Sequence, residues 1–234
     1  KLFTLILIAL LALPTMNVFG QQLDGPPPLP SKEKKLYLTV FLQGFFDVTD
    51  MHKVIADPSG PVYQWPGAIV DTITVELHDA ADYTNIVYTA YGVNLNQDGT
   101  ANTGSKTYVS IPPTYNGSYY ITVNHRNHIE TTTAAEVLFN TASITYDFTT
   151  SASQAYGSNM KMLSTGVYGL FAGDVQKDGT LEPLTDLANV KLKIDTFQGG
   201  YINEDVDGDG LVEPLSDLAK VKLAIDNFVT AVHP

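Results

Sequence analysis

The chain has 234 residues, with 25 acidic and 13 basic side chains, a formal net charge of −12 at pH 7 and no cysteine. So acidic a balance argues against nucleic acid as a partner, because that binding needs a basic surface. Without cysteine, neither a disulfide framework nor a cysteine-linked lipid anchor is expected.

The N-terminus is typical of a secretory signal peptide. Lys1 precedes an apolar run over residues 2–13, and Gly20 provides a small residue near a cleavage point. The run is too short to span a bilayer stably. We therefore expect residues 1–20 to be removed, leaving a secreted protein, extracellular or on the cell surface, with no membrane span. Residues 21–34 contain consecutive prolines, which predict an exposed, extended N-terminal arm.

Residues 35–150 predict a β-sandwich domain. This segment is rich in Thr, Tyr, Val and Ile, in short alternating runs separated by Gly, Asn and Pro turns. Alternation places Ile73, Val75 and Leu77 on one inward face. About seven such strands imply two packed sheets with Greek-key-like connections. The expected strands are 36–45, 72–78, 85–91, 106–111, 118–124, 136–139 and 143–148.

The cluster His125-Arg126-Asn127-His128 is a candidate metal or catalytic site. In a continuous strand, residues three apart point to opposite faces, so the two imidazoles would diverge. We therefore expect a structural role, with Arg126 or Asn127 bonding to backbone or to the linker toward Tyr156.

Two further features of this segment allow more than one interpretation. Trp65, with Tyr63 and Pro66, offers an aromatic platform for sugar, although a single tryptophan is more often partly buried core. The spacing of Asn94, Asn96 and Asp98 mimics a calcium loop, but no acid completes it and the following Asp98-Gly99 pair is typical of a turn.

Residues 151–170 are interpreted as a linker, and residues 171–234 as a second domain made of two copies of one acidic loop and helix. The copies start at Asp174 and Asp205. Oxygen-bearing side chains at loop positions 1, 3 and 5, a glycine at 6 and an acid at 9 form a pattern that wraps calcium. The side chains in question are Asp174, Gln176, Asp178 and Glu182 in the first copy, and Asp205, Asp207, Asp209 and Glu213 in the second.

Each loop is followed by an apolar stripe at helical spacing. Leu184, Leu187, Val190, Ile194 and Phe197 recur as Leu215, Leu218, Val221, Ile225 and Phe228. We expect the two stripes to pack against each other. Thr185 and Ser216 are candidate N-terminal caps, and Gly199 and Gly200 are expected to stop the first helix.

From Gly173 to Phe228 the chain resembles a dockerin-type I pair of calcium-binding repeats. The resemblance implies two calcium ions and adds the Thr180 and Leu211 carbonyls as ligands. The family places its last acidic ligand at loop position 12, but here the acids Asp186 and Asp217 stand one residue later. A one-residue bulge at the preceding prolines would restore them as ligands; alternatively, Glu182 and Glu213 ligate directly or through water.

Residues 111–123 contain a glycine turn followed by Ser-Tyr-Tyr-Ile-Thr-Val, which resembles the hairpin of prealbumin-like and collagen-adhesin B-type sandwiches. More broadly, residues 35–228 look like the C-terminal modules of secreted surface proteins of Gram-negative bacteria, in which an immunoglobulin-like sandwich precedes a dockerin-like pair. The expected fold class is thus mainly β with a small α domain.

The hypothesis that follows is a non-catalytic, secreted, calcium-binding structural or adhesive surface protein that self-assembles into an extracellular filament or matrix. The sequence lacks the nucleophile elbow, phosphate-binding loop and metalloprotease motifs. The alternative is a carbohydrate-binding or protein-binding module, or dockerin-mediated attachment to a scaffold. Besides calcium, the expected partners are further copies of the chain, or a cell-surface protein or glycan.

Overall fold

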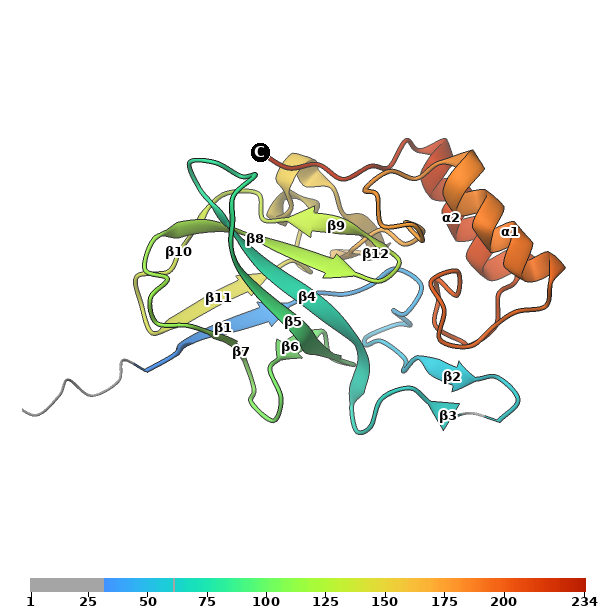
Figure 1. Cartoon of the computed structure of the whole chain (residues 1–234), viewed down its shortest axis with the longest axis horizontal. Coiled ribbons are helices and arrows are strands. Elements are labelled where there is room, and N and C mark those ends of the chain that lie inside the picture. The colour runs from blue at the N-terminus through green and yellow to red at the C-terminus, as the bar shows by residue number, and fades with distance from the viewer. Residues whose placement is uncertain (1–31, 61) are drawn as a thin grey trace, which may run out of the picture. The chain divides into compact units, whose positions relative to one another are not determined.

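Strands make up most of the regular structure of the chain, for which a computed structural model describes residues 32–60 and 62–234 (Figure 1). The expected signal peptide, 1–20, and most of the expected arm, 21–34, lie outside the described residues. Lys32–Pro234 form a single unit of contacting elements. Within that unit, no helix has the length and hydropathy that crossing a bilayer requires.

The strands are short except for two central ones of 11 residues. They are β1 (Lys34–Thr39), β2 (Ile55–Asp57), β3 (Val62–Tyr63), β4 (Ile69–Asp79), β5 (Ile86–Asn96), β6 (Thr100–Asn102), β7 (Val109–Ile111), β8 (Ser118–His125), β9 (His128–Thr132), β10 (Val137–Leu138), β11 (Ser143–Asp147), β12 (Lys161–Ser164) and β13 (Val167–Gly169). The helical elements are η1 (Ala152–Gln154), η2 (Tyr156–Ser158), η3 (Pro183–Leu187), α1 (Ala188–Asp195), η4 (Pro214–Leu218) and α2 (Ala219–Asp226).

Nine strands form one sheet in the order β10-β8-β4-β5-β6-β1-β11, with β9 also paired to β8 and β7 to β1. The pairs are antiparallel except for β1 and β11, which run parallel. Leu38 of β1 and Val75 of β4 belong to the same buried cluster, so the two ends of the sheet share one core. The expected mainly β class is confirmed.

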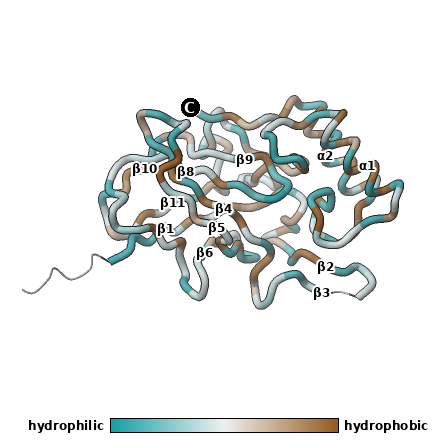
Figure 2. The backbone as a smooth tube through the Cα atoms, in the orientation of Figure 1, coloured by the Kyte–Doolittle hydropathy of each residue, from teal (hydrophilic) through white to brown (hydrophobic). Residues whose placement is uncertain are grey.

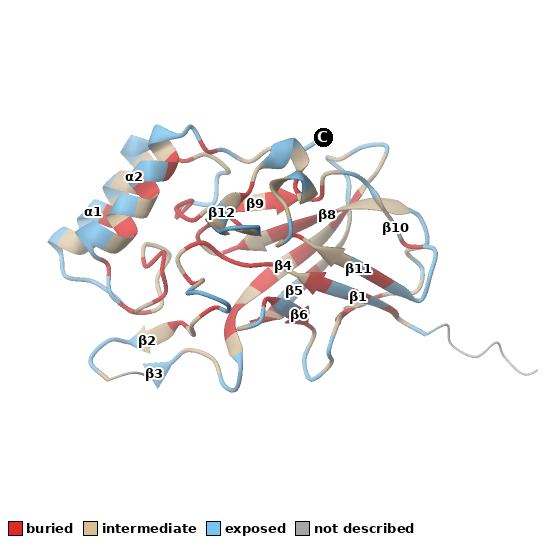
Figure 3. Cartoon of the chain, turned by 180° about the vertical axis from the view of Figure 1, so that it is seen from behind, coloured by how far each residue is buried: buried red, intermediate tan, exposed pale blue. Residues whose placement is uncertain are grey.

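The core follows the alternation that the sequence shows. Ile73, Val75 and Leu77 of β4 are all buried, as expected, because successive side chains of a strand point to opposite faces. Apolar residues follow the central strands (Figure 2), and buried residues follow the same path (Figure 3). Each expected strand overlaps an observed one, but residues 40–45 leave the sheet after Thr39. The nine strands pair in one sheet, so the two packed sheets with Greek-key-like connections remain a prediction. We call the part of the structure from residue 32 to 170 the sandwich, as a name for these residues only.

Residues 171–234 form the helical pair, whose packing differs from the expectation. Val190 and Val221 are buried in one apolar cluster, but Leu184, Phe197, Leu215 and Phe228 are 88–97% exposed. The reason lies at both ends of each helix. The π-helical turns η3 and η4 add a residue ahead of α1 and α2, which rotates the leading leucines out of the stripe.

The helix ends also differ from the expectation. Thr185 lies inside η3 and does not cap the helix. Helix α1 ends at Asp195, before the expected glycines, and Phe197 takes a left-handed conformation with φ of 52°. The amide of Gln198 then donates to the Lys193 carbonyl at 3.0 Å, as in a glycine-terminated helix. Phe228 has a φ of 54° at the same place in the second copy.

Candidate metal centre

The two acidic loops, loop 1 (174–182) and loop 2 (205–213), fold around their leading aspartates. In loop 1, Asp174 Oδ2 accepts from the Gly179 amide at 3.2 Å. In loop 2, Asp205 Oδ2 accepts from the Gly210 amide at 3.1 Å. Gly179 and Gly210 have φ values of 80° and 85°, which residues other than glycine rarely adopt. The repeat in sequence is therefore a repeat in backbone structure.

Asp186 and Asp217 close the loops in the same way. Asp217 Oδ1 accepts from the Val206 amide and Oδ2 from the Glu213 amide, both at 2.8 Å. Asp186 accepts from the Val175 and Glu182 amides, both at 2.9 Å. Both aspartates are completely buried.

The extra residue ahead of these aspartates is accommodated in the π-helical turns η3 and η4, which start at Pro183 and Pro214. Glu182 and Glu213 are exposed at the start of these turns. Asp186 and Asp217 therefore close the loops through backbone hydrogen bonds, whereas Glu182 and Glu213 are on the exposed side; which of these acids ligates an ion stays a prediction.

Loop 2 brings three carboxylates together. Asp205, Asp207 and Asp209 each offer an oxygen within 4.8 Å of the others, the only such acidic or histidine cluster found among the described residues. Asp207 Oδ2 accepts from Lys220 Nζ at 2.8 Å. Asp207 Oδ1 is buried and has no hydrogen-bond partner in the described part of the chain. Buried polar atoms are normally paired, so this oxygen can take a further partner, such as a water molecule or a cation.

The electrostatics of loop 2 support the same interpretation. Burial raises the pKa of Asp205 to about 8, and the nearby Asp217 and Asp207 carboxylates add to the effect against the opposing Arg126 charge. Burial, followed by the Asp207 charge, raises the pKa of Asp217 to about 6. The protein alone thus disfavours the full negative charge of this cluster. Oxygen donors of this kind suit a hard cation such as calcium.

Loop 1 has fewer of these features. Gln176 and Asp178 are exposed, and only Asp174 and Asp186 are buried. Lys177 Nζ lies 3.7 Å from Asp174 Oδ2 and donates to the His128 carbonyl at 2.7 Å. Each loop thus has one lysine beside its acids, Lys177 in loop 1 and Lys220 in loop 2, and loop 1 differs in the exposure of Gln176 and Asp178.

The residues of the expected carbonyl ligands, Thr180 and Leu211, also make other contacts. Thr180 pairs with Thr230 in a short antiparallel bridge. Leu211 is 41% exposed, and its amide donates to Asp209 Oδ1 at 2.8 Å.

The sandwich encloses loop 2. His52 Nε2 lies 2.7 Å from the Asp207 carbonyl oxygen, and the Ile55 amide donates to the Gly208 carbonyl at 2.9 Å. Gly44 has a φ of 92°, and a Cβ there would lie 2.7 Å from the Val206 carbonyl oxygen. Only glycine allows the backbones to approach so closely.

The cluster at 125–128 is the turn of the β8–β9 hairpin and holds the start of loop 2. Arg126 donates to the carbonyls of Ile202 and Asp205, the latter at 3.2 Å. Asn127 Nδ2 donates to the Asn203 carbonyl at 2.9 Å and to the Asp205 carbonyl at 2.8 Å. The expected backbone bonding is confirmed, although it reaches the acidic repeat and not the linker near Tyr156.

The expectation that the two histidines diverge was wrong. The strand reverses at Arg126 and Asn127, so His125 and His128 face each other as a cross-strand pair with their Nδ1 atoms 2.9 Å apart. Burial lowers the pKa of both imidazoles, against the opposing Asp71 charge at His125. Their Nε2 atoms contact Asp71 Oδ2 at 3.0 Å and the Gln43 carbonyl at 2.8 Å.

Asp71 is a central residue that sequence reasoning missed. It is fully buried, and its carboxylate accepts from Arg126 Nε at 3.0 Å and from the Tyr201 hydroxyl at 2.7 Å. The Trp65 indole also donates to it, so Trp65 is a structural residue and not an open sugar platform. The one signal in the sequence was an acid near the start of β4, within the run Ile-Val-Asp-Thr-Ile-Thr-Val.

In comparison with known proteins, the chain matches no protein-family model and no curated protein sequence.

Proposed function

We propose that the chain is a non-catalytic, secreted, calcium-binding structural protein, in which a dockerin-like pair of calcium repeats is fixed to a Greek-key-like β-sandwich built on the nine-stranded sheet. The observation that carries the proposal is the buried Asp207 Oδ1, which lacks a partner in the described residues and lies within a cluster of three carboxylates. A buried carboxylate oxygen without a partner is costly, and Lys220 pairs only with the other oxygen of Asp207.

The proposal includes two ions of unequal affinity. In loop 2 the ligands would be Asp205, Asp207, Asp209 and Asp217, with the Leu211 carbonyl. Loop 1 would use Asp174, Asp178 and Asp186 with Gln176 and the Thr180 carbonyl. Loop 1 has one acid fewer, and its Gln176 and Asp178 are exposed, so we expect weaker binding there. Bound calcium would supply no reaction; it would neutralise the carboxylates and hold the loops on the sandwich.

Calorimetric titration with calcium tests this proposal directly. We expect a tight and a weak step in the chelator-treated protein, and loss of the tight step in the Asp207→Asn variant. Asp226→Asn is the matched control, because Asp226 is an exposed acid of the same helical pair that pairs with Lys222. An unchanged tight step in Asp207→Asn would refute the assignment.

The extracellular role rests on the signal-peptide-like N-terminus and on the affinity expected of such loops, which millimolar calcium outside the cell would fill. Self-assembly into a filament or matrix is the proposed use of the folded unit. Negative-stain microscopy of the mature protein, with and without calcium, checks it. Dispersed monomers in both conditions would contradict assembly and leave calcium binding unaffected.

Attachment to a scaffold is a second candidate function, favoured by the outer surface of the helical pair. Leu184 and Phe197 recur as Leu215 and Phe228, and all four are exposed. An exposed apolar surface of this kind is typical of an interaction site. If the protein attaches through it, the double variant Phe197→Ser, Phe228→Ser should be released from the surface of producing cells while any filaments persist.

A further inference from the structure

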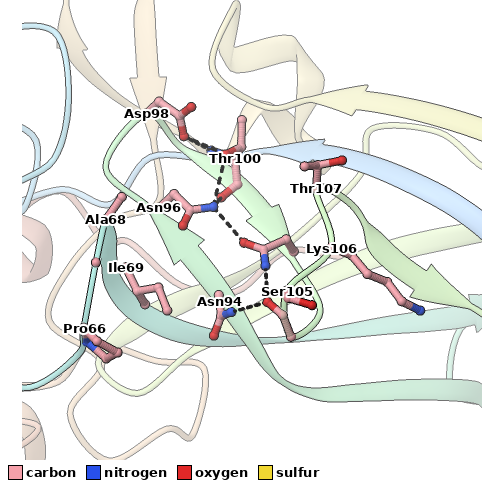
Figure 4. A pocket seen from close by; sticks show the side chains of 13 residues that line it. Pro66, Ala68, Ile69, Asn94, Asn96, Asp98, Thr100, Ser105, Lys106 and Thr107 are labelled. Carbon is pink, nitrogen blue, oxygen red and sulfur yellow. Dashed lines mark hydrogen bonds between the residues drawn. The ribbon is translucent and has the colours of Figure 1, made fainter.

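A hollow of about 620 Å³ lies on the sandwich, away from the metal centre, over β5, β6 and the loops around residues 66–69 and 104–107 (Figure 4). Its volume falls within the range of roughly 300–1,000 Å³ that small-molecule sites occupy. Three asparagines line it: Asn94 and Asn96, two apart on β5, and Asn102 on β6. Asparagine is depleted in strands, so three on one surface break a local preference, as functional sites often do.

The amide groups of these asparagines are held in fixed orientations (Figure 4). Asn96 Nδ2 donates to Asn102 Oδ1 at 2.8 Å, and Asn102 Nδ2 donates to the Gly104 carbonyl at 2.7 Å. Asn94 Nδ2 donates to the same carbonyl at 3.1 Å. Asn94 Oδ1 and Asn96 Oδ1 accept no hydrogen bond from the described residues. The hollow therefore presents pre-oriented, neutral acceptors.

The charged side chains at the rim are largely engaged elsewhere. Asp98 Oδ1 accepts from the amide and hydroxyl of Thr100 at 3.0 and 2.6 Å. Lys106 points away from the asparagines (Figure 4) and pairs with Glu33. The remaining lining includes the Ser105 and Thr107 hydroxyls and the apolar Ile69. Neutral acceptors and hydroxyls beside an apolar contact suit an uncharged, hydroxyl-rich ligand.

An extended peptide fits this surface less well. Peptides that add to a sheet bond to the free backbone of an edge strand. Here the backbones of β5 and β6 pair with each other, Asn94 opposite Asn102 and Leu95 opposite Ala101. A ligand in the hollow would meet side chains and not a free edge.

We infer that this hollow, the amide basin, binds a neutral glycan, with Asn94 and Asn96 as the principal acceptors for its hydroxyls. The lining contains no aromatic side chain, so stacking adds nothing and a single site binds weakly, with a dissociation constant of about 0.1–10 mM. Many copies on one surface would raise the avidity. This inference is independent of calcium, because none of the proposed metal ligands lines the basin.

Nuclear magnetic resonance of the calcium-saturated, ¹⁵N-labelled mature chain tests this inference. Maltotriose, cellotriose, mannotriose and N-acetylchitotriose are titrated separately to about 20 mM. We expect at least one to shift the side-chain amide signals of Asn94, Asn96 and Asn102. Asn94→Ala should weaken that binding at least tenfold, and Asn140→Ala, at an exposed asparagine outside the basin, should leave it unchanged.

A second variant guards against misfolding. Asn96→Asp keeps the shape of the side chain but adds a negative charge, and it should weaken binding while the melting temperature stays near that of the parent. No shift of the basin amides with any of the four sugars would overturn the inference. The same holds if calcium alone or an uncharged tripeptide shifts them equally, or if the Asn140→Ala control loses binding.

Discussion

In loop 1 and loop 2 the leading aspartate and the closing aspartate accept matching backbone hydrogen bonds, yet the surroundings of the two loops differ. Loop 2 is covered by the sandwich, and its start is held by Arg126 and Asn127. Loop 1 keeps Gln176 and Asp178 exposed and places Lys177 beside its leading acid. We therefore expect one repeated sequence to give two sites of unequal affinity, because neighbouring residues set the charge and rigidity that determine affinity for calcium.

The largest effect is expected from Arg126→Met. The substitution removes both the donor to loop 2 and the main charge partner of the buried Asp71. Removing one partner of a buried pair costs about 3–5 kcal/mol. Urea unfolding in calcium measures this loss, with Lys106→Met, at an exposed pair with Glu33, as a control that loses little. A loss below about 1 kcal/mol for Arg126→Met would mean that the hairpin does not hold loop 2.

Asp205→Asn is expected to have the next largest effect, and its sign should depend on calcium. At ion concentrations a hundred times the dissociation constant, losing a site costs about 2.7 kcal/mol. In chelator the same change should be neutral or stabilising, because burial and neighbouring acids raise the pKa of Asp205 to about 8. Thermal unfolding in both conditions, beside Asp174→Asn, gives the comparison. A larger loss in calcium for Asp174→Asn would reverse the proposed ranking of the loops.

Acid should loosen loop 2 before loop 1. Burial lowers the pKa values of His125 and His128. Below about pH 6.5 these histidines are therefore protonated in the unfolded chain but remain neutral in the folded chain. The stability from these two groups is therefore complete above that pH and is lost as the pH falls. Hydrogen exchange in saturating calcium, where protonation of Asp205 and Asp217 competes with the ion and so does not oppose the effect of the histidines, is compared at pH 7.5 and 5.5. After correction for intrinsic rates, it should show a greater loss of protection at Gly210 than at Gly179. Equal losses would mean that the hairpin supports both loops alike.

The smallest effect is expected from Lys177→Met. The Lys177 side chain is 28% exposed, so losing its charge should lower the free energy of unfolding by no more than about 1 kcal/mol in calcium-free protein. Removing a positive charge beside Asp174 should at the same time tighten calcium binding by loop 1 a few-fold. Calorimetric titration measures the weak step, and an unchanged affinity would show that Lys177 does not cause the difference between the loops.

Local features of the fold were readable from the sequence. The alternation of Ile73, Val75 and Leu77 is a short-range signal, and the structure buries all three. The acids Asp186 and Asp217 stood one residue late in both copies, and the π-helical turns show how the backbone accommodates that residue.

Features that depend on distant residues were not readable. Asp71 meets Arg126 and Tyr201 only after the sheet and the helical pair have come together. The reversal at Arg126 and Asn127 was missed because neither residue is a glycine, the usual signal of a two-residue hairpin turn. Phe197 was expected to continue the apolar stripe of the helix. Its left-handed φ of 52° ends the helix instead, and that conformation was not expected because it is unusual for an aromatic residue.

The contact at Gly44 has a consequence for how such a protein changes over generations. Any side chain at this position would strike the Val206 carbonyl, and the backbone there already has a φ of 92°. A recombination event that joined the helical pair to a different sandwich would have to provide a glycine at the position equivalent to 44. The two parts should therefore be inherited together, and glycine at position 44 should vary less than the exposed residues around it.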